Sequence, residues 1–257
     1  MSLRRWARAA TPYVLRARLA RTRRALADAV RRERFAKPAC DAGTTQLVEQ
    51  VRLRQPIRPG CTIAGKLANI RLAASRIERV ILREGEVFSF WSAVGAPTRA
   101  NGYAIGRAIV ADRLDETVGG GLCQLSGALY ELALRGGLNI VERRAHSHDL
   151  YDEAERFTPL GLDATVVFGF TDLRFRNLTG TDVAFRFRID NGELTASLHA
   201  SAPLAPCELR LKRRDVADGG VEAEVERIGS DGIVRDQTLQ RYARLSGHSV
   251  VTNSRGR

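Results

Sequence analysis

The sequence predicts an α+β protein: N-terminal helices, a central glycine-rich turn that leads into a helix, and then a mostly antiparallel sheet. Apolar residues recur at helical spacing in residues 66–80 and 123–135. Apolar and polar residues alternate in residues 173–177 and 183–189, as they do in strands with one face in water. The helical segments precede the strands instead of alternating with them, which is typical of α+β proteins.

The chain divides into four predicted regions. A basic amphipathic helical arm is expected over residues 1–35, and an irregular, proline-punctuated linker over residues 36–63. The core domain is expected over residues 64–204, and a strand-rich C-terminal hairpin and tail over residues 205–257. Within the core, the apolar run at residues 164–170 is expected to form a central strand.

The basic excess of the chain is concentrated at its N-terminus. The whole chain carries 41 basic and 29 acidic residues, and residues 1–37 hold twelve of the basic and two of the acidic ones. The remainder, with 29 basic against 27 acidic residues, is nearly neutral. We therefore expect no specific binding of nucleic acid.

Two interpretations of the N-terminal arm remain open. Arginines separate apolar residues at helical spacing, and Trp6 and Tyr13 are aromatic side chains of the kind that lie at lipid headgroups. These features favour a helix that lies on an anionic membrane surface. The alternative is a helix that packs on its own domain and exposes a basic face. No secretory leader or membrane span is evident, so we expect a cytoplasmic protein, peripheral on the inner leaflet under the first interpretation.

Gly119, Gly120 and Gly121 precede the predicted helix that begins near Cys123. Glycine allows a positive φ and a close approach of the backbone, and the N-terminus of a helix favours negative charge. A cysteine at this place has a lowered pKa and reacts as a thiolate. The Gln124 amide and the Cys123 backbone N–H are candidates to hold an oxyanion. The alternatives are a buried structural cysteine or an anion bound at the turn without catalysis.

Two histidines and two aspartates follow the cysteine. His146 and His148 are two residues apart, so on an extended segment they point to the same side, where one imidazole would serve as the base for Cys123. Asp163 and Asp172 flank the apolar run and are the candidates to orient that imidazole. A further alternative is a Cys/His metal site, because His-x-His can chelate zinc; no other cofactor is expected.

Four blocks of the sequence resemble the VanW-like family, which is named for an accessory gene of vancomycin-resistance clusters. The blocks are FSFWSAVGAPTRANGYAIGRAI (88–109), VGGGLCQLSGALYELALRGGLNIVERRAHS (118–147), PLGLDATVVF (159–168) and TDLRFRN (171–177). The resemblance implies an association with the cell envelope and glycopeptide resistance, without a defined activity. It places the family's motif positions at Trp91, Gly95, Pro97, Gly102, Gly119, Gly120, Gly121, Cys123, Gln124, Tyr130, Glu142, Arg143, His146, Ser147, Asp163 and Asp172.

The sequence supports two classes of function. In the first, the protein is a cysteine-dependent enzyme that acts on amide or acyl bonds of a peptidoglycan precursor or a related peptide. In the second, it is a non-catalytic module that binds a cell-wall precursor or another anionic ligand at the membrane surface, and Cys123 is packed inside. The residues expected to contact the ligand are Gly119, Gly120, Gly121, Ser147, Trp91, Tyr130 and Arg143.

Structural roles compete with ligand binding at some of these positions. Glu142 and Arg143 are expected to form an ion pair that holds their strand in place. Trp91 belongs to an aromatic set with Phe88 and Phe90 that alternates across a predicted strand, so we expect it to pack in the core. Stacking of Trp91 on the ring of a ligand is the alternative.

Overall fold

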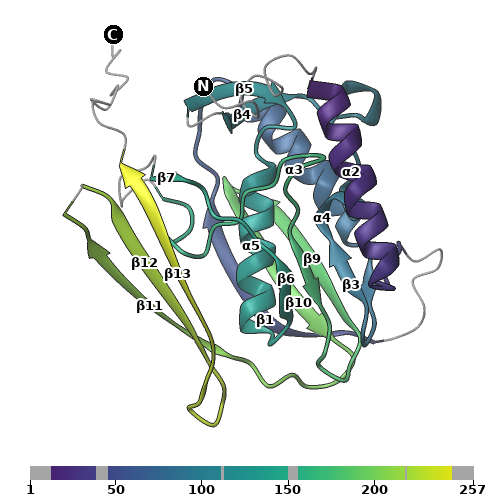
Figure 1. Cartoon of the computed structure of the whole chain (residues 1–257), viewed down its shortest axis with the longest axis vertical. Coiled ribbons are helices and arrows are strands. Elements are labelled where there is room, and N and C mark those ends of the chain that lie inside the picture. Colours follow the sequence, from purple (N-terminus) through teal and green to yellow (C-terminus); the bar gives the residue numbers. More distant parts are fainter. Residues whose placement is uncertain (1–12, 39–45, 111–112, 150–155, 218, 245–257) are drawn as a thin grey trace.

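The computed structural model describes residues 13–38, 46–110, 113–149, 156–217 and 219–244 (Figure 1). It has the α+β architecture that the sequence predicts, with helices packed on antiparallel sheets. The helices are α2 (Tyr13–Val30), α3 (Ile63–Ile77), α4 (Phe90–Val94) and α5 (Leu122–Arg135), with a short 3₁₀ turn at Arg99–Asn101.

The main sheet has four antiparallel strands, and α5 and α3 lie against it (Figure 1). Its strands, in spatial order, are β1 (Val48–Pro56), β10 (Glu193–Ala200), β9 (Val183–Asp190) and β2 (Ile81–Leu82). The strands β9 and β10 form the hairpin that Asn191–Gly192 predicts, with Asp190 opposite Glu193. Apolar side chains of β10, including Leu198, point toward α5 and are fully buried.

Smaller sheets complete the fold. One contains β3 (Val87–Ser89), β8 (Arg174–Arg176) and β6 (Asn139–Glu142), and β4 (Ile105–Val110) pairs with β5 (Arg113–Val118) in a hairpin. The C-terminal sheet contains β11 (Glu208–Asp215), β12 (Val221–Ile228), β13 (Val234–Arg244) and β7 (His148–Asp149). Because β7 pairs in parallel with the end of β13, the C-terminal strand holds the segment that carries both candidate histidines.

The core is centred on α5. Leu125, Leu129 and Leu132 on this helix have no exposed surface, as their helical spacing predicts. The helix ends where Gly136 and Gly137 follow it; a side chain at Gly136 would collide with Leu198, since an added Cβ would lie 2.1 Å from its Cδ2. Burial of nearly the whole helix fixes the position of its N-terminus.

One face of the helix α2 packs on its own domain, which both interpretations of the arm allow. Ala17 is buried against Gly169. Arg24 pairs with Glu142 and donates to the carbonyl of Phe170. Nearer the end of α2, Asp28 pairs with Arg174 at 2.8 Å. Trp6 and Pro12 lie outside the described residues.

Two predicted segments are wrong in part. Residues 36–63 are not irregular throughout, because Val48–Pro56 forms β1 at the edge of the main sheet. Residues 164–170 are not a central strand: an isolated bridge joins Val167 to Thr171, and Gly169 has a φ of +85°. Within this run Ala164 and Val166 are buried in the core and Val167 is exposed, so apolar character alone misled the prediction.

Candidate active site

The three glycines are required by a close backbone contact at Gly120 and by positive φ at Gly119 and Gly121. A Cβ at Gly120 would lie 2.0 Å from the carbonyl oxygen of Gly106, and Gly121 has a φ of +98°. The fully buried Asn69 amide on α3 donates to the carbonyls of Gly120 and Ala104, at 3.0 and 2.9 Å. These hydrogen bonds hold the glycine turn against α3. They thereby fix the start of α5, where Leu122 and Cys123 line a cavity.

Cys123 lies in the first turn of α5. Its Sγ is 3.8 Å from Thr165 Oγ1 and 4.0 Å from the carbonyl oxygen of Val166. The Thr165 segment is itself held in place, because Ser126 Oγ donates to the carbonyl of Ala164 at 2.6 Å. Among the described residues, no carbonyl accepts from the backbone N–H of Cys123, as is usual in the first turn of a helix.

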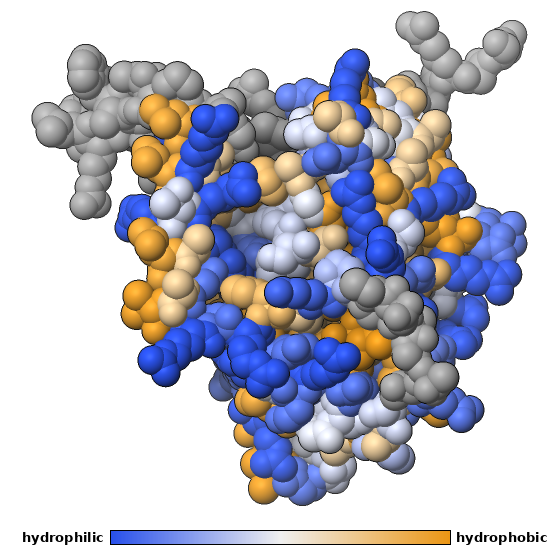
Figure 2. Space-filling view, turned by 90° about the vertical axis from the view of Figure 1, so that its right-hand side faces the viewer, coloured by the Kyte–Doolittle hydropathy of each residue, from blue (hydrophilic) through white to orange (hydrophobic). Residues whose placement is uncertain are grey.

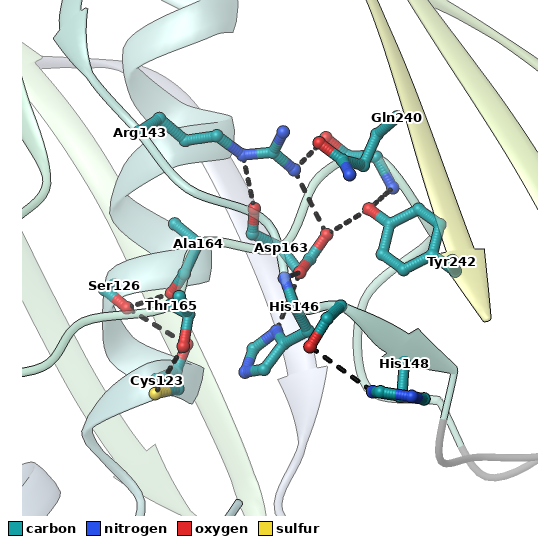
Figure 3. Close-up of polar contacts among 12 residues, drawn as sticks. Cys123, Ser126, Arg143, His146, His148, Asp163, Ala164, Thr165, Gln240 and Tyr242 are labelled. Atoms are coloured by element: carbon teal, nitrogen blue, oxygen red, sulfur yellow. Dashed lines mark hydrogen bonds and ion pairs between the residues drawn. The ribbon is translucent and has the colours of Figure 1, made fainter. Parts of the chain in front are cut away.

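His146 lies between the cysteine and a buried carboxylate. Its backbone N–H and its Nδ1 are each 2.7 Å from Asp163 Oδ2. An ionised carboxylate only accepts hydrogen bonds, so Nδ1 carries a proton and donates. The ring extends from Asp163 toward Cys123 (Figure 3). Its Nε2 is buried and has no hydrogen-bond partner among the described residues.

Asp163 is the most densely hydrogen-bonded group of the site. Arg143 donates to its carboxylate at 3.1 Å and to its backbone carbonyl at 2.8 Å. The Tyr242 hydroxyl donates to Oδ1 at 2.5 Å and accepts the Gly161 N–H at 2.8 Å. The Arg143 guanidinium also lies 4.8 Å above the centre of the Tyr130 ring. These contacts fix both oxygens of the carboxylate.

The pKa values of the three groups favour a charged pair. Burial raises the pKa of the Cys123 thiol, but the neighbouring His146 imidazole, together with Val166 and Thr165, brings the net pKa below its usual value. Burial lowers the pKa of His146, but Asp163 and the Cys123 sulfur raise it to about 10. Burial raises the pKa of Asp163, but His146 and Arg143 lower it to about 2. These shifts favour a thiolate–imidazolium pair at a lower pH than an ordinary cysteine would need to ionise.

Cys123 and His146 both line a cavity of about 820 Å³. Its walls come from α2, the start of α3, the β4–β5 hairpin, the glycine turn and residues 165–168. On the side of the molecule that carries α2, hydrophilic side chains surround a hollow in the surface (Figure 2). Cys123 thus stands in the wall of a space large enough for a substrate of several residues.

The second histidine and the second aspartate lie elsewhere. His148 does not point to the same side as His146; its Nδ1 contacts Ser147 Oγ at 3.3 Å, away from the sulfur (Figure 3). The segment is extended only at β7, so strand alternation does not apply to both residues. Asp172 accepts from Ser89 Oγ, from the Trp91 N–H and from Arg174, and forms no contact with His146. Of the two alternatives for each role, His146 and Asp163 lie together beside the cysteine, and His148 and Asp172 lie elsewhere.

The expected ligand contacts differ in outcome. Gln124 lines the cavity, and its amide donates one N–H to the carbonyl of Pro56 at 3.0 Å, which leaves the second N–H of the same amide. Tyr130 is buried under Arg143, and Arg143 is committed to Asp163. Ser147 is not among the described residues that line the cavity.

The other residues that were expected to contact a ligand line the cavity or pack behind its wall. Gly119 and Gly121 line it, while Gly120 is buried against Gly106. Trp91 packs edge-on against Phe90 and Phe168, as the core interpretation predicts, and it also lines the cavity.

The expected Glu142–Arg143 ion pair is absent from the described structure. Neighbouring residues on a strand face opposite sides; accordingly, Glu142 pairs with Arg24 and Arg174, whereas Arg143 turns inward to Asp163. Two separate clusters result, one that fastens α2 and one that supports His146.

Sequence reasoning missed Tyr242 and Thr165. Thr165 stands in the apolar run, and its place beside the sulfur follows only from the path of that segment. Tyr242 is about eighty residues from Asp163 along the chain, and no local pattern marks it. The sequence signal that could have drawn attention to it is a single aromatic residue in the polar run VRDQTLQRYAR of β13.

The described residues contain no group of three His, Cys, Asp or Glu side chains placed to hold a metal ion. The displacement of His148 removes the second imidazole that the Cys/His metal alternative requires. In the same part of the chain, no helix combines the length and the apolar character needed to cross a bilayer.

The protein is thus an α+β protein with a cysteine, a histidine and an aspartate arranged in series at the wall of a cavity. A family model described as VanW like protein matches residues 65–199, more than half of the chain, and the chain belongs to this family. All three residues of the series lie inside the matched range, whereas Tyr242 lies beyond it.

Two curated relatives are similar to this chain over about half of its length. One is an uncharacterized protein, YoaR, of Bacillus subtilis, with 37% identity over 133 residues, which are 52% of this chain and 42% of the relative. The other is the vancomycin B-type resistance protein VanW of Enterococcus faecalis, with 30% identity over 135 residues, 52% of this chain and 49% of the relative. The similarity therefore spans less than half of each relative. No solved structure matches the chain.

The charged pair predicts an unusual pH dependence for alkylation of Cys123. An ordinary thiol reacts about tenfold more slowly for each pH unit below its pKa. We expect Cys123 to keep its rate with iodoacetamide to a lower pH than an ordinary thiol, because His146 stays protonated up to about pH 10. His146→Ala should move the profile to higher pH, and His148→Ala should leave it unchanged. Mass spectrometry of the Cys123 peptide measures these rates, and a His146→Ala profile that overlies the wild type would contradict the pairing.

The two aspartates provide a matched comparison. Asp163→Asn removes the negative charge that raises the pKa of His146, so the rate–pH profile of Cys123 should move to higher pH. At a fixed pH below the new midpoint, the alkylation rate should fall about tenfold for each pH unit by which the profile moves. Asp172→Asn disturbs an equally buried carboxylate in the other cluster and should lower stability without moving the profile. Equal displacement of the profile in both variants would show that it reports general destabilisation instead of the His146–Asp163 contact.

Proposed function

We propose that this protein is a cysteine-dependent enzyme that acts on amide or acyl bonds of a peptidoglycan precursor or a related cell-wall peptide. One observation carries the proposal: the His146 ring is held by a buried carboxylate on one side and presents an unpartnered Nε2 toward a thiol in the wall of an open cavity. A purely structural cysteine has no need of such a neighbour.

In the acylation step, the Cys123 thiolate attacks the carbonyl carbon of the substrate, and a carbon–sulfur bond forms as the carbonyl becomes a tetrahedral oxyanion. The backbone N–H of Cys123 at the helix N-terminus is the donor available to that oxygen. The His146 imidazolium then gives its Nε2 proton to the leaving nitrogen or oxygen, and the bond to the leaving group breaks. The product of this step is a thioester on Cys123.

In the second step, His146 takes a proton from water or from an amine as that nucleophile attacks the thioester. The carbon–sulfur bond breaks, and the thiolate and the imidazolium are restored. Throughout, Asp163 holds the ring by its Nδ1 and favours the protonated form. Arg143 and Tyr242 act on Asp163 and are positioning residues.

The substrate class is supported by one relative and by the cavity. A similar protein of Enterococcus faecalis is named a vancomycin B-type resistance protein, which favours a cell-wall peptide among the possible acyl donors. The non-catalytic alternative requires a thiol packed inside the protein, but Cys123 lines the cavity. The enzyme is therefore the function that we favour.

The test is covalent trapping of the acyl group. The protein is incubated with a peptidoglycan digest, and with 4-nitrophenyl acetate as a simple acyl donor, and its intact mass is followed. We expect a hydroxylamine-sensitive adduct on Cys123, absent in Cys123→Ala, and a loss of about a thousandfold or more in acylation rate for His146→Ala. Cys207→Ala serves as the control thiol. A Cys123→Ala variant that forms the same adduct would end the proposal.

We also propose that α2 rests on an anionic membrane surface. Its outward face carries four exposed apolar side chains at helical spacing, Leu15, Leu19, Leu26 and Val30. At 100° per residue they fall on one narrow stripe, and the exposed Arg18 and Arg23 flank it. This combination of an apolar stripe and flanking cations complements a bilayer with anionic lipids. Apolar and hydrophilic patches adjoin on the α2 side of the molecule (Figure 2).

Flotation with vesicles tests this surface. The inner face of α2 packs on the domain, so point variants are preferable to removal of the arm. Leu19→Gln with Leu26→Gln should strongly reduce recovery with vesicles that contain phosphatidylglycerol, and none of the proteins should float with phosphatidylcholine alone. Leu178→Gln, an equally exposed leucine elsewhere, is the matched control. Equal recovery of the double variant and the control would rule out docking by this stripe.

A further inference from the structure

The cavity beside Cys123 is strongly cationic. Five of the residues that line it are basic: Arg18, Arg21, Arg58, Lys66 and Arg107. None of its described lining residues is acidic. Such an arrangement raises the local concentration of anions and excludes cations. The chain beyond residue 37 carries nearly balanced charge, whereas the charged side chains that line the cavity are all basic.

Two of these cations stand on either side of the glycine turn. The Lys66 side chain packs against Gly121: a Cβ added at Gly121 would lie 2.7 Å from the Lys66 Cγ. The backbone of Arg107 lies against Gly120: a Cβ added at Gly120 would lie 2.7 Å from the backbone nitrogen of Arg107. The glycines thus allow both basic residues to approach the residues immediately before Cys123.

Within the part of the chain that the structure describes, these two cations lack counter-charges. No described carboxylate forms an ion pair with Lys66 or Arg107; the Lys66 ammonium lies 5.9 Å from the centre of the Phe157 ring. Burial, and then the charge of Arg107, lower the pKa of Lys66 to about 8. An anion placed between them would relieve this repulsion, whereas a neutral or cationic ligand would not.

We infer that this cationic wall binds a carboxylate of the acyl donor and thereby places its reacting carbonyl at Cys123. The inference rests on the proposed function and names its substrate class: an acidic peptide, with Lys66 and Arg107 as the residues that determine specificity. The α2 helix adds Arg18 and Arg21 to the lining of the cavity, and Arg21 lies 5.0 Å from the centre of the Phe168 ring. The aromatic side chains Trp91, Phe157 and Phe168 in the same lining suit the apolar parts of the peptide.

The first test compares two alkylating agents that differ in charge. The rate of Cys123 modification is measured with iodoacetate, which carries a carboxylate, and with neutral iodoacetamide, and their ratio cancels any change in thiolate content. We expect the iodoacetate/iodoacetamide ratio to fall about tenfold in Lys66→Gln with Arg107→Gln. It should fall likewise when wild type is moved from low to high salt. Arg188→Gln, an exposed arginine outside the cavity, should keep the wild-type ratio.

The second test does not depend on the thiol. Calorimetric titration of Cys123→Ala compares N-acetyl-Gly-Gly with its neutral C-terminal amide. We expect the acid to bind at least about tenfold more tightly than the amide, and this preference to vanish when Lys66→Gln and Arg107→Gln are added.

The outcomes separate the two proposals. An unreactive Cys123 that still prefers the acid would overturn the enzyme but keep the carboxylate site. A reactive Cys123 with unchanged ratios, and equal binding of acid and amide, would overturn the carboxylate site and keep the enzyme. Protection of Cys123 by inorganic phosphate, but not by succinate at equal ionic strength, would assign the wall to phosphate and overturn the choice of a carboxylate.

Discussion

The buried carboxylate of Asp163 is the constraint on which the site depends. A charge removed from water must be compensated by hydrogen bonds and opposite charge, and Asp163 draws these from two segments that are distant in the chain. Arg143 and His146 follow β6, and Tyr242 lies on β13. Satisfying one carboxylate therefore fixes the C-terminal sheet, the histidine segment and the imidazole in a single arrangement. The tautomer and direction of His146 are consequences of that arrangement.

The position of Cys123 has a separate origin. The helix α5 is buried in the core, and its first turn emerges from a glycine turn that Asn69 holds against α3. Cys123 thus belongs to the rigid centre of the fold, and His146 to a loop fastened by polar contacts. A rigid nucleophile opposite a hydrogen-bonded base is what preorganised catalysis requires. The cavity between them is completed by α2, whose own attachment depends on the second ionic cluster, around Glu142 and Arg174.

Several elements of the fold could be predicted from the sequence pattern. The helices near residues 66–80 and 123–135 and the hairpin at Asn191–Gly192 follow from periodicity and turn chemistry, because each signal is local. The failures have a common physical cause. The run at 164–170 is apolar because it packs beside Cys123, not because it pairs in a sheet. His148 and Asp172 share residue type and neighbourhood with His146 and Asp163, and sequence distance does not show which of each pair turns toward the sulfur.

The sequence by itself determined the class of fold, the family, the cysteine at the start of a helix after three glycines, and a short set of histidines and aspartates in reach of it. These properties depend on residue type and on spacing within one turn, strand or motif. Only the tertiary structure decided that His146 pairs with Asp163, that Tyr242 and Arg143 support the pair, and that basic residues from four segments meet in one cavity. Contacts between segments far apart in the chain are fixed by how the core packs, and no local pattern encodes them.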